Sequence, residues 1–97
     1  MTAATFIVTL ASTAQPSGEV LVQEVGDEAV LLDLSSERYF GLDPIGTRIW
    51  QLLADAPSLQ QVHATLCGEF DAPAERIQAD LLALVQELAV AGLVEIA

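Results

Sequence analysis

The sequence predicts an α+β domain in which a three-stranded antiparallel sheet (β-β-β) is followed by a three-helix bundle. Short apolar runs separated by turn residues occupy residues 20–42. From residue 44 to residue 91, apolar side chains instead recur at helical spacing, with proline-containing breaks at Pro57 and Pro73. The chain has 97 residues and is 53% hydrophobic, which fits one domain with a single modest core.

Residues 1–18 are predicted to form an N-terminal arm or an extra strand, and residues 19–97 the main domain. Residues 5–10 are apolar enough for a strand, whereas residues 11–18 are small, polar and proline-containing, as in a flexible connector. No Lys or Arg precedes the short apolar run, so we do not interpret it as a signal peptide. The pattern leaves open whether the arm pairs with the sheet.

Three strands are expected at residues 20–25, 29–34 and 38–42, joined as a meander. The pair Gly26-Asp27 can supply the positive φ angles of the first tight turn. In the middle strand, Val30, Leu32 and Leu34 alternate with positions that are expected to be more exposed. If the last strand lies at a sheet edge, its free N–H and C=O groups can accept another chain.

Two helix starts follow from capping signals. Asp43 is expected to cap a helix that begins at Pro44 and ends near residue 54. Ser58 and Gln61 form a capping-box pattern for a second helix that ends near residue 68.

The third helix is expected to open at Pro73 and to end before Gly92, a residue suited to the position after a C-cap. Each helix has an apolar stripe, and residues 93–96 form a short extended tail. The stripes are Ile45, Ile49, Leu52 and Leu53; Leu59, Val62, Leu66 and Phe70; and Ile77, Leu81, Leu84, Val85 and Leu88.

The net charge is −11, from 14 acidic residues against three arginines. Such a surface repels nucleic acid and disfavours an anionic membrane, so neither is an expected partner. Basic peptides or basic protein faces are better partners, although solubility alone also explains the charge. The single cysteine, Cys67, allows no intrachain disulfide and fits a reducing cytoplasm. The apolar run at residues 81–94 is interrupted and too short to span a bilayer.

No constellation of catalytic residues is visible. His63 and Cys67 are four residues apart on one helix, but they flank an apolar stripe and lack an orienting third group. Two such ligands are too few for zinc, and the sequence has no calcium loop and no glycine-rich phosphate loop. We therefore expect no enzyme activity, no metal and no cofactor.

Several residues have two interpretations. Asp80 either pairs with Arg76 on the helix surface or lines a groove wall in which Ala83 leaves room for an incoming chain. Tyr39 and Trp50 either anchor a partner or cap the small core. The core interpretation is favoured for Trp50, and both remain open for Tyr39.

The segments Val30–Leu34, Arg38–Pro44 and Ile49-Trp50, with the pattern from Asp80 to Leu93, resemble the PqqD-like family. Members of this family are recognition elements for precursor peptides of ribosomally synthesised and post-translationally modified peptide (RiPP) pathways. The resemblance covers about residues 20–96 and looks most like stand-alone members encoded beside lasso-peptide leader peptidases and cyclases. It implies a winged helix-turn-helix-like fold that binds the leader segment of a precursor.

The resemblance also implies where the leader binds. The leader adds as a strand beside the third sheet strand and lies against the third helix. Position 37 is Glu, where the family often has Gly. Gly adopts a left-handed turn conformation freely, whereas Glu would be strained there or require another type of turn. The implied peptide-binding residues are Arg38, Tyr39, Phe40, Gly41 and Leu42 on the strand, with Phe40 as a backbone donor, and Arg76, Asp80, Ala83, Leu84 and Glu87 on the helix.

These observations lead us to expect a cytoplasmic, non-enzymatic peptide chaperone of lasso-peptide biosynthesis. It binds the leader by β-strand addition and presents the precursor to a separate leader peptidase, with a cyclase as a further partner. The alternatives are a PqqD-type carrier of the peptide precursor of a quinone cofactor, or an acidic winged-helix regulator. An enzyme with Cys67 as its nucleophile is a more remote alternative.

Overall fold

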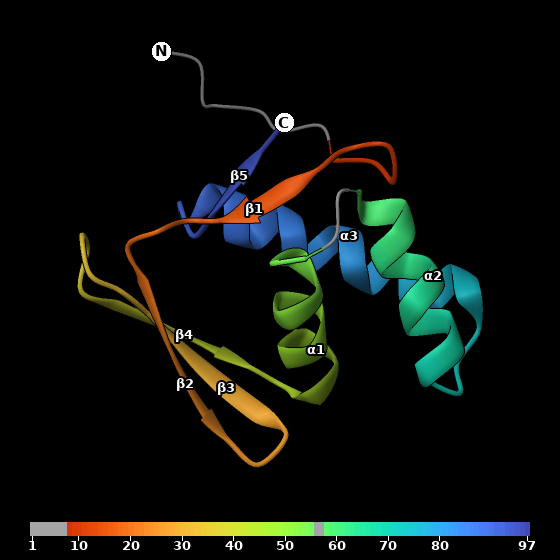
Figure 1. The fold of residues 1–97 in the computed structure, drawn as a ribbon, viewed down its shortest axis with the longest axis horizontal. Helices are drawn as coiled ribbons and strands as arrows, with labels where there is room; N and C mark the ends of the chain where they lie inside the picture. The colour runs from red at the N-terminus through yellow and green to blue at the C-terminus, as the bar shows by residue number, and fades with distance from the viewer. Residues whose placement is uncertain (1–7, 56–57) are drawn as a thin grey trace.

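The computed structural model describes residues 8–55 and 58–97 and confirms the predicted α+β class (Figure 1). One sheet has the strand order β2-β3-β4 and is antiparallel throughout. The three helices lie to one side of this sheet. The elements are β2 (Val20–Val25), β3 (Glu28–Asp33), β4 (Arg38–Leu42), α1 (Pro44–Leu53), α2 (Leu59–Glu69) and α3 (Ala74–Val90).

A second, two-stranded sheet joins the two ends of the described chain. It consists of β1 (Ala14–Pro16) and β5 (Val94–Ile96), which pair antiparallel beside α3 (Figure 1). The strand predicted at residues 5–10 lies partly outside the described residues, and residues 8–10 are not in a strand. The arm does pair, but with the C-terminal segment, which the sequence predicted to be a short extended tail, and not with the β2-β3-β4 sheet.

The arm also completes the start of α2. The backbone N–H groups of Leu59 and Gln60 each donate a 2.9 Å hydrogen bond, to the carbonyl oxygens of Ser12 and Leu10 respectively. These two donors belong to the first turn of a helix and have no partner within it. The domain boundary near residue 18 stays a prediction, but residues before it stabilise this helix end.

The predicted helix caps are confirmed. The Asp43 carboxylate accepts a 2.7 Å hydrogen bond from the N–H of Gly46, and the Ser58 hydroxyl accepts one from the N–H of Gln61. Pro73 is the N-cap of α3 and offers no side-chain hydrogen bond. Gly92 has a φ of +80° and follows the C-cap.

The end of α3 is a Schellman motif. The N–H of Leu93 donates to the carbonyl of Leu88 at 2.9 Å, and that of Gly92 donates to Ala89 at 3.1 Å. Leu93 is buried, so the chain turns back onto the core before it enters β5.

The core lies between the β2-β3-β4 sheet and the helices. Trp50 is 7% exposed and belongs to this core, whereas Tyr39 is 75% exposed and caps nothing. The core residues include Leu31, Ile49, Leu53, Leu59, Val62, Leu66, Ile77, Leu81, Val85 and Leu88. Of the predicted stripes, Ile45, Leu52, Phe70 and Leu84 are only partly buried and lie at its margin.

The predicted core face of β3 is wrong. Val30 and Leu34 are 40% and 51% exposed, whereas Ala29, Leu31 and Asp33 face the helices and are buried. Both faces of this strand are largely apolar, so alternation alone cannot tell which one is buried. The packing of α1 against β3 decides the face.

Candidate peptide-binding groove

β4 is an edge strand, because no further strand pairs with it in the part of the chain that the structure describes. The N–H of Leu34, just after β3, donates to the carbonyl of Glu19 at 3.0 Å. Hydrogen bonding to the two sides of an antiparallel strand alternates from residue to residue. Even-numbered residues of β3 therefore bond to β2, and odd-numbered residues bond to β4.

This alternation identifies the free backbone groups of β4. Leu31 and Phe40 form a hydrogen-bonded pair in the register, so the N–H and C=O of Phe40 point into the sheet. Those of Tyr39 and Gly41 point outward, to the open edge. An added strand would therefore use Tyr39 and Gly41, and not the Phe40 donor that the sequence suggested.

A groove of about 420 Å³ runs between this edge and α3. Its walls are β4 and one face of α3, and the first turns of α1 form its floor. Some residues that line the groove were predicted from the sequence to bind the peptide: Phe40, Gly41, Leu42, Asp80, Ala83, Leu84 and Glu87. Four others were not predicted: Asp43, Ile45, Gly46 and Ile49.

The other implied residues lie elsewhere. Arg38 and Tyr39, with Phe40, line a smaller hollow of about 210 Å³ farther along β4, where Ala91 and Leu93 form the opposite wall. Arg76 is exposed and lines neither hollow. The sequence did contain an indication of the groove floor. Ile45 and Ile49 are one helical turn apart directly after the N-cap, so they lie on the same face of α1.

The groove combines an apolar floor with acidic margins. Asp43, Asp80 and Glu87 contribute carboxylates, while Ile45 and Leu84 contribute apolar surface. Of the two interpretations of Asp80, the structure favours the groove wall: the ion pair found in residues 8–55 and 58–97 is a different one. Such a groove is suited to a chain with apolar side chains and positive charge.

The turn before β4 is closed by Asp33. Its carboxylate accepts hydrogen bonds from the hydroxyls of Ser36 at 2.7 Å and Ser35 at 2.9 Å. These hydrogen bonds, from Ser36 first and Ser35 second, lower the pKa of Asp33 below its ordinary value. Glu37 in the same turn has a φ of +58°, which is strained for a residue with a Cβ.

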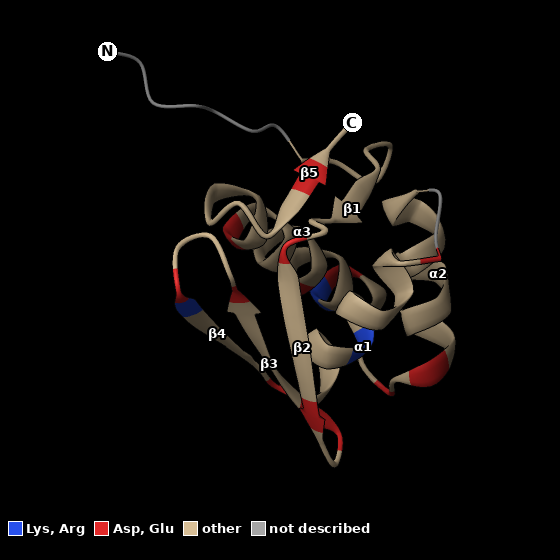
Figure 2. Cartoon of the chain, turned by 60° about the vertical axis from the view of Figure 1, so that its left-hand side comes forward, with Lys and Arg blue, Asp and Glu red and all other residues tan. Residues whose placement is uncertain are grey.

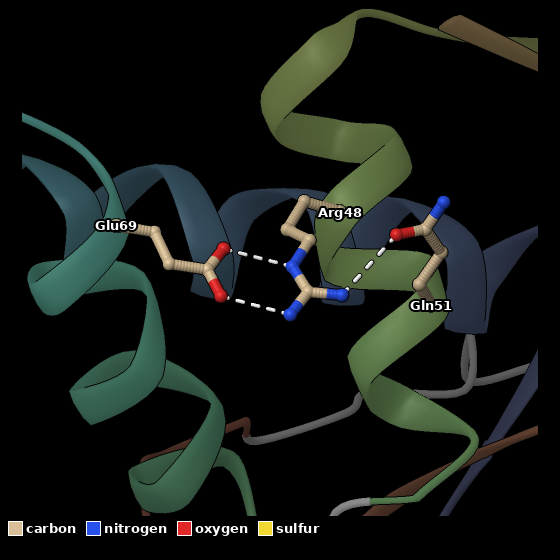
Figure 3. Close-up of polar contacts among 3 residues, drawn as sticks. All are labelled: Arg48, Gln51 and Glu69. Carbon is tan, nitrogen blue, oxygen red and sulfur yellow. Dashed lines mark hydrogen bonds and ion pairs between the residues drawn. The ribbon is translucent and has the colours of Figure 1, made fainter. Parts of the chain in front are cut away.

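A polar network links the helices to the sheet on the side away from the groove. The guanidinium of Arg48 donates two hydrogen bonds of 2.8 Å to the carboxylate of Glu69 on α2 and one of 3.3 Å to Gln51 (Figure 3). Gln51 donates in turn to Glu24 of β2 at 3.2 Å. The hydrogen bond from Arg48 lowers the pKa of Glu69. This network connects α1 to α2 and to β2 across the surface.

The sheet face that points away from the helices is apolar and exposed. By register, Leu21, Leu32 and Tyr39 form one cross-strand row on it, followed by Gln23, Val30 and Gly41. Leu21 is 55% exposed and Val30 is 40% exposed. Acidic residues gather at the β2–β3 hairpin end of the sheet (Figure 2). We call this surface the outer sheet face.

His63 contacts both Cys67 and the start of α3. The Nε2 atom of His63 lies 2.8 Å from the carbonyl oxygen of Ala74 and 3.5 Å from the Cys67 sulfur. Because a carbonyl oxygen only accepts, Nε2 of His63 is the donor in its hydrogen bond to Ala74. The histidine thus links α2 to the start of α3.

Two features are absent from residues 8–55 and 58–97. Among them, no cluster of three or more His, Cys, Asp or Glu side chains has the arrangement needed to hold a metal ion. None of the helices in these segments combines the length and the apolar character required to cross a membrane.

An unpaired edge strand, a facing helix and an apolar floor between them define a class of protein that can take up an extended peptide chain. The chain belongs to the family described as coenzyme PQQ synthesis protein D (PqqD), whose model matches residues 28–94. This confirms the resemblance to the PqqD-like family.

Two solved structures share this fold. One is described as TbiB1 in complex with the TbiA(beta) leader peptide; it is 33% identical, has a TM-score of 0.77, and the match covers 84% of this chain and 94% of that one. The other is a lasso peptide synthetase B1 complexed with the leader peptide, 28% identical with a TM-score of 0.75, covering 84% and 96% of the two chains.

A curated relative is the PqqA binding protein of Rhizobium meliloti (strain 1021). It is 38% identical over 63 residues, which are 65% of this chain and 64% of the relative. The matched region thus spans slightly less than two thirds of that protein.

Proposed function

We propose that this protein binds the leader segment of a ribosomally made precursor peptide by adding it as a strand to β4. The observation that carries this proposal is the open β4 edge, which faces α3 across an apolar groove. The outward backbone groups of Tyr39 and Gly41 can pair with the main chain of any extended segment. A leader is disordered when free, so part of the binding free energy is spent on ordering it.

Two relatives of known structure support this proposal, since both are complexes with a leader peptide and the matched region covers nearly all of each. They are 33% and 28% identical to this chain. Because the second is a lasso peptide synthetase B1, we infer that the pathway is lasso-peptide biosynthesis.

Specificity would come from the side chains that the peptide meets in the groove. The main-chain bonds are independent of sequence, whereas Asp80 and Glu87 on α3 favour a leader with basic residues beside its apolar ones. These two carboxylates are separated by two helical turns, and Ala83 and Leu84 lie between them. The strand holds the peptide and α3 discriminates between sequences.

The protein would act without catalysis, in the cytoplasm, and hand the bound precursor to a separate leader peptidase and then a cyclase. We take the outer sheet face as the surface for a protein partner, because it exposes neighbouring apolar residues such as Leu21 and Val30.

The PqqA binding protein among the relatives favours a second candidate, a carrier of the precursor of a quinone cofactor. The genes beside this one separate the two candidates, because a lasso-peptide operon encodes a leader peptidase and a cyclase. A winged-helix regulator is disfavoured, since α3 carries Glu75, Asp80 and Glu87 against a single Arg, and carboxylates repel the DNA phosphates.

Titration with a fluorescein-labelled synthetic leader, taken from the precursor encoded beside this gene, tests the proposal. We expect saturable binding that weakens with added salt. The absence of saturable binding to every precursor in the gene neighbourhood would refute it. A scrambled leader of the same composition serves as the control for non-specific attraction between charges.

A further inference from the structure

Gly41 is the only residue of β4 without a side chain, yet the fold does not require a glycine there. Its φ is not positive, and a Cβ added to it would meet no atom within 4 Å. Gly46 differs, because a Cβ there would lie 3.0 Å from the carboxylate of Asp43. A glycine inside a strand weakens the strand and often marks a place where a ligand approaches closely.

The space left by Gly41 opens onto the outer sheet face. A hollow of about 360 Å³ lies there, separate from the groove. The cross-strand row Gln23, Val30 and Gly41 crosses it, and the residues of the next row border it toward the β2–β3 hairpin. It is lined by Gln23, Val25, Glu28, Ala29, Val30, Gly41, Leu42 and Asp43.

The groove and this hollow flank the same edge. Both are lined by Gly41, Leu42 and Asp43, but the groove opens toward α3 and the hollow opens on the outer sheet face. Side chains of a strand alternate between the two faces of a sheet. A peptide added to β4 therefore sends the residue paired with Gly41 into the hollow and its two neighbours into the groove.

We propose that Gly41 and the hollow form a specificity subsite for one large side chain of the bound peptide. This inference rests on the proposed function. The chemistry of the walls defines the side chain: Val25 and Val30 offer apolar surface, while Glu28 and Asp43 offer carboxylates. The fitting residue has an apolar stem and an end that donates hydrogen bonds, as in Lys, Arg or Tyr.

The substitution Gly41→Val tests this subsite. The Val side chain enters open space and suits a strand, and the edge N–H and C=O remain available. We expect the melting temperature to stay the same or rise, while the affinity for the labelled leader falls by about tenfold or more. Gly41→Ala should give a smaller loss in the same direction.

The matched control is Gly68→Ala on α2, where an added Cβ also meets no atom within 4 Å. It should leave leader affinity unchanged. An alanine scan of the leader then identifies the residue paired with Gly41: replacing it should abolish most of the difference between the wild-type protein and Gly41→Val.

Failure of this inference is distinct from failure of the proposed function. If the wild-type protein does not bind the leader at all, the proposed function is wrong. If the wild-type protein binds and Gly41→Val binds equally well, the subsite is wrong and the groove stands. A loss of affinity that no single leader substitution relieves would also overturn the subsite.

Discussion

The carboxylate of Asp43 accepts a 2.7 Å hydrogen bond from the N–H of Gly46, and this contact joins the end of β4 to the start of α1. Both residues line the groove, together with Ile45 from the same turn. The bend that stops the strand therefore also places the floor beneath the open edge. A helix cap and a binding surface share the same residues.

Removing this cap should destabilise the protein. We expect Asp43→Ala to lower the free energy of unfolding by about 1 kcal/mol, the usual value of an N-cap side chain. Asp43→Asn keeps an acceptor and should lose only a small part of that. Urea denaturation measures both variants, and equal losses in the two would show that the hydrogen bond to Gly46 is not what stabilises the helix.

Proline substitutions should separate the free edge from the internal ladder. Tyr39→Pro removes an outward N–H, so we expect a folded protein whose leader affinity falls sharply relative to Tyr39→Ala. Phe40→Pro removes a donor within the sheet and should instead lower the free energy of unfolding by about 1–3 kcal/mol.

The opposite edge of the sheet offers a control for this prediction. The alternation of hydrogen bonds also leaves the N–H of Val22 pointing outward, on β2. Val22→Pro should fold and bind the leader as the wild-type protein does. Circular dichroism and fluorescence anisotropy give the two readouts, and equal leader binding by Tyr39→Pro and Tyr39→Ala would mean that the peptide does not pair with this edge.

Relieving the strained turn should stabilise the protein. Glu37 has a φ of +58°, so Glu37→Gly is expected to raise the free energy of unfolding by about 1 kcal/mol. For a domain of this size, that corresponds to a rise of about 4–8 °C in melting temperature. Glu28→Gly makes the same chemical change in a strand and should be destabilising. A lower melting temperature for Glu37→Gly would contradict the prediction.

Asp33 should make stability depend on pH in the acid range. Its pKa is lowered in the folded state by hydrogen bonds from Ser36 and Ser35, so the unfolded chain binds this proton more readily. Its contribution is therefore complete above its unfolded pKa and is lost as the pH falls through the folded one. The stability difference between wild type and Asp33→Asn should shrink as the pH is lowered below the ordinary pKa of an aspartate, about 4. A constant difference in urea titrations over this range would exclude the effect.

Local signals predicted the elements of this fold well. Asp43-Pro44, Ser58 and Gly92 each act on residues within one turn, so the chain alone reveals where the helices begin or end. The pairing of β1 with β5 joins three-residue strands from opposite ends of the chain, and no local pattern specifies it. The buried face of β3 likewise depended on where α1 packs.

The candidate site was also predictable only where local spacing determines it. Helical spacing brought Asp80, Ala83 and Glu87 to one wall, as expected from the sequence. The direction of the backbone donors in β4 was not predictable, because it follows from the pairing of Leu34 with Glu19 two strands away. The hollow beside Gly41 depends on three strands at once.

The two walls of the groove rest on a common floor. β4 packs on β3 and α1, while α3 packs on α1, α2 and β5. A peptide in the groove would contact both β4 and α3, which are otherwise connected mainly through α1. Its arrival should therefore slow hydrogen exchange at the edge amides of Tyr39 and Gly41 and stiffen α3 at the same time. A bound leader would then connect the two walls of the groove directly, from β4 to α3.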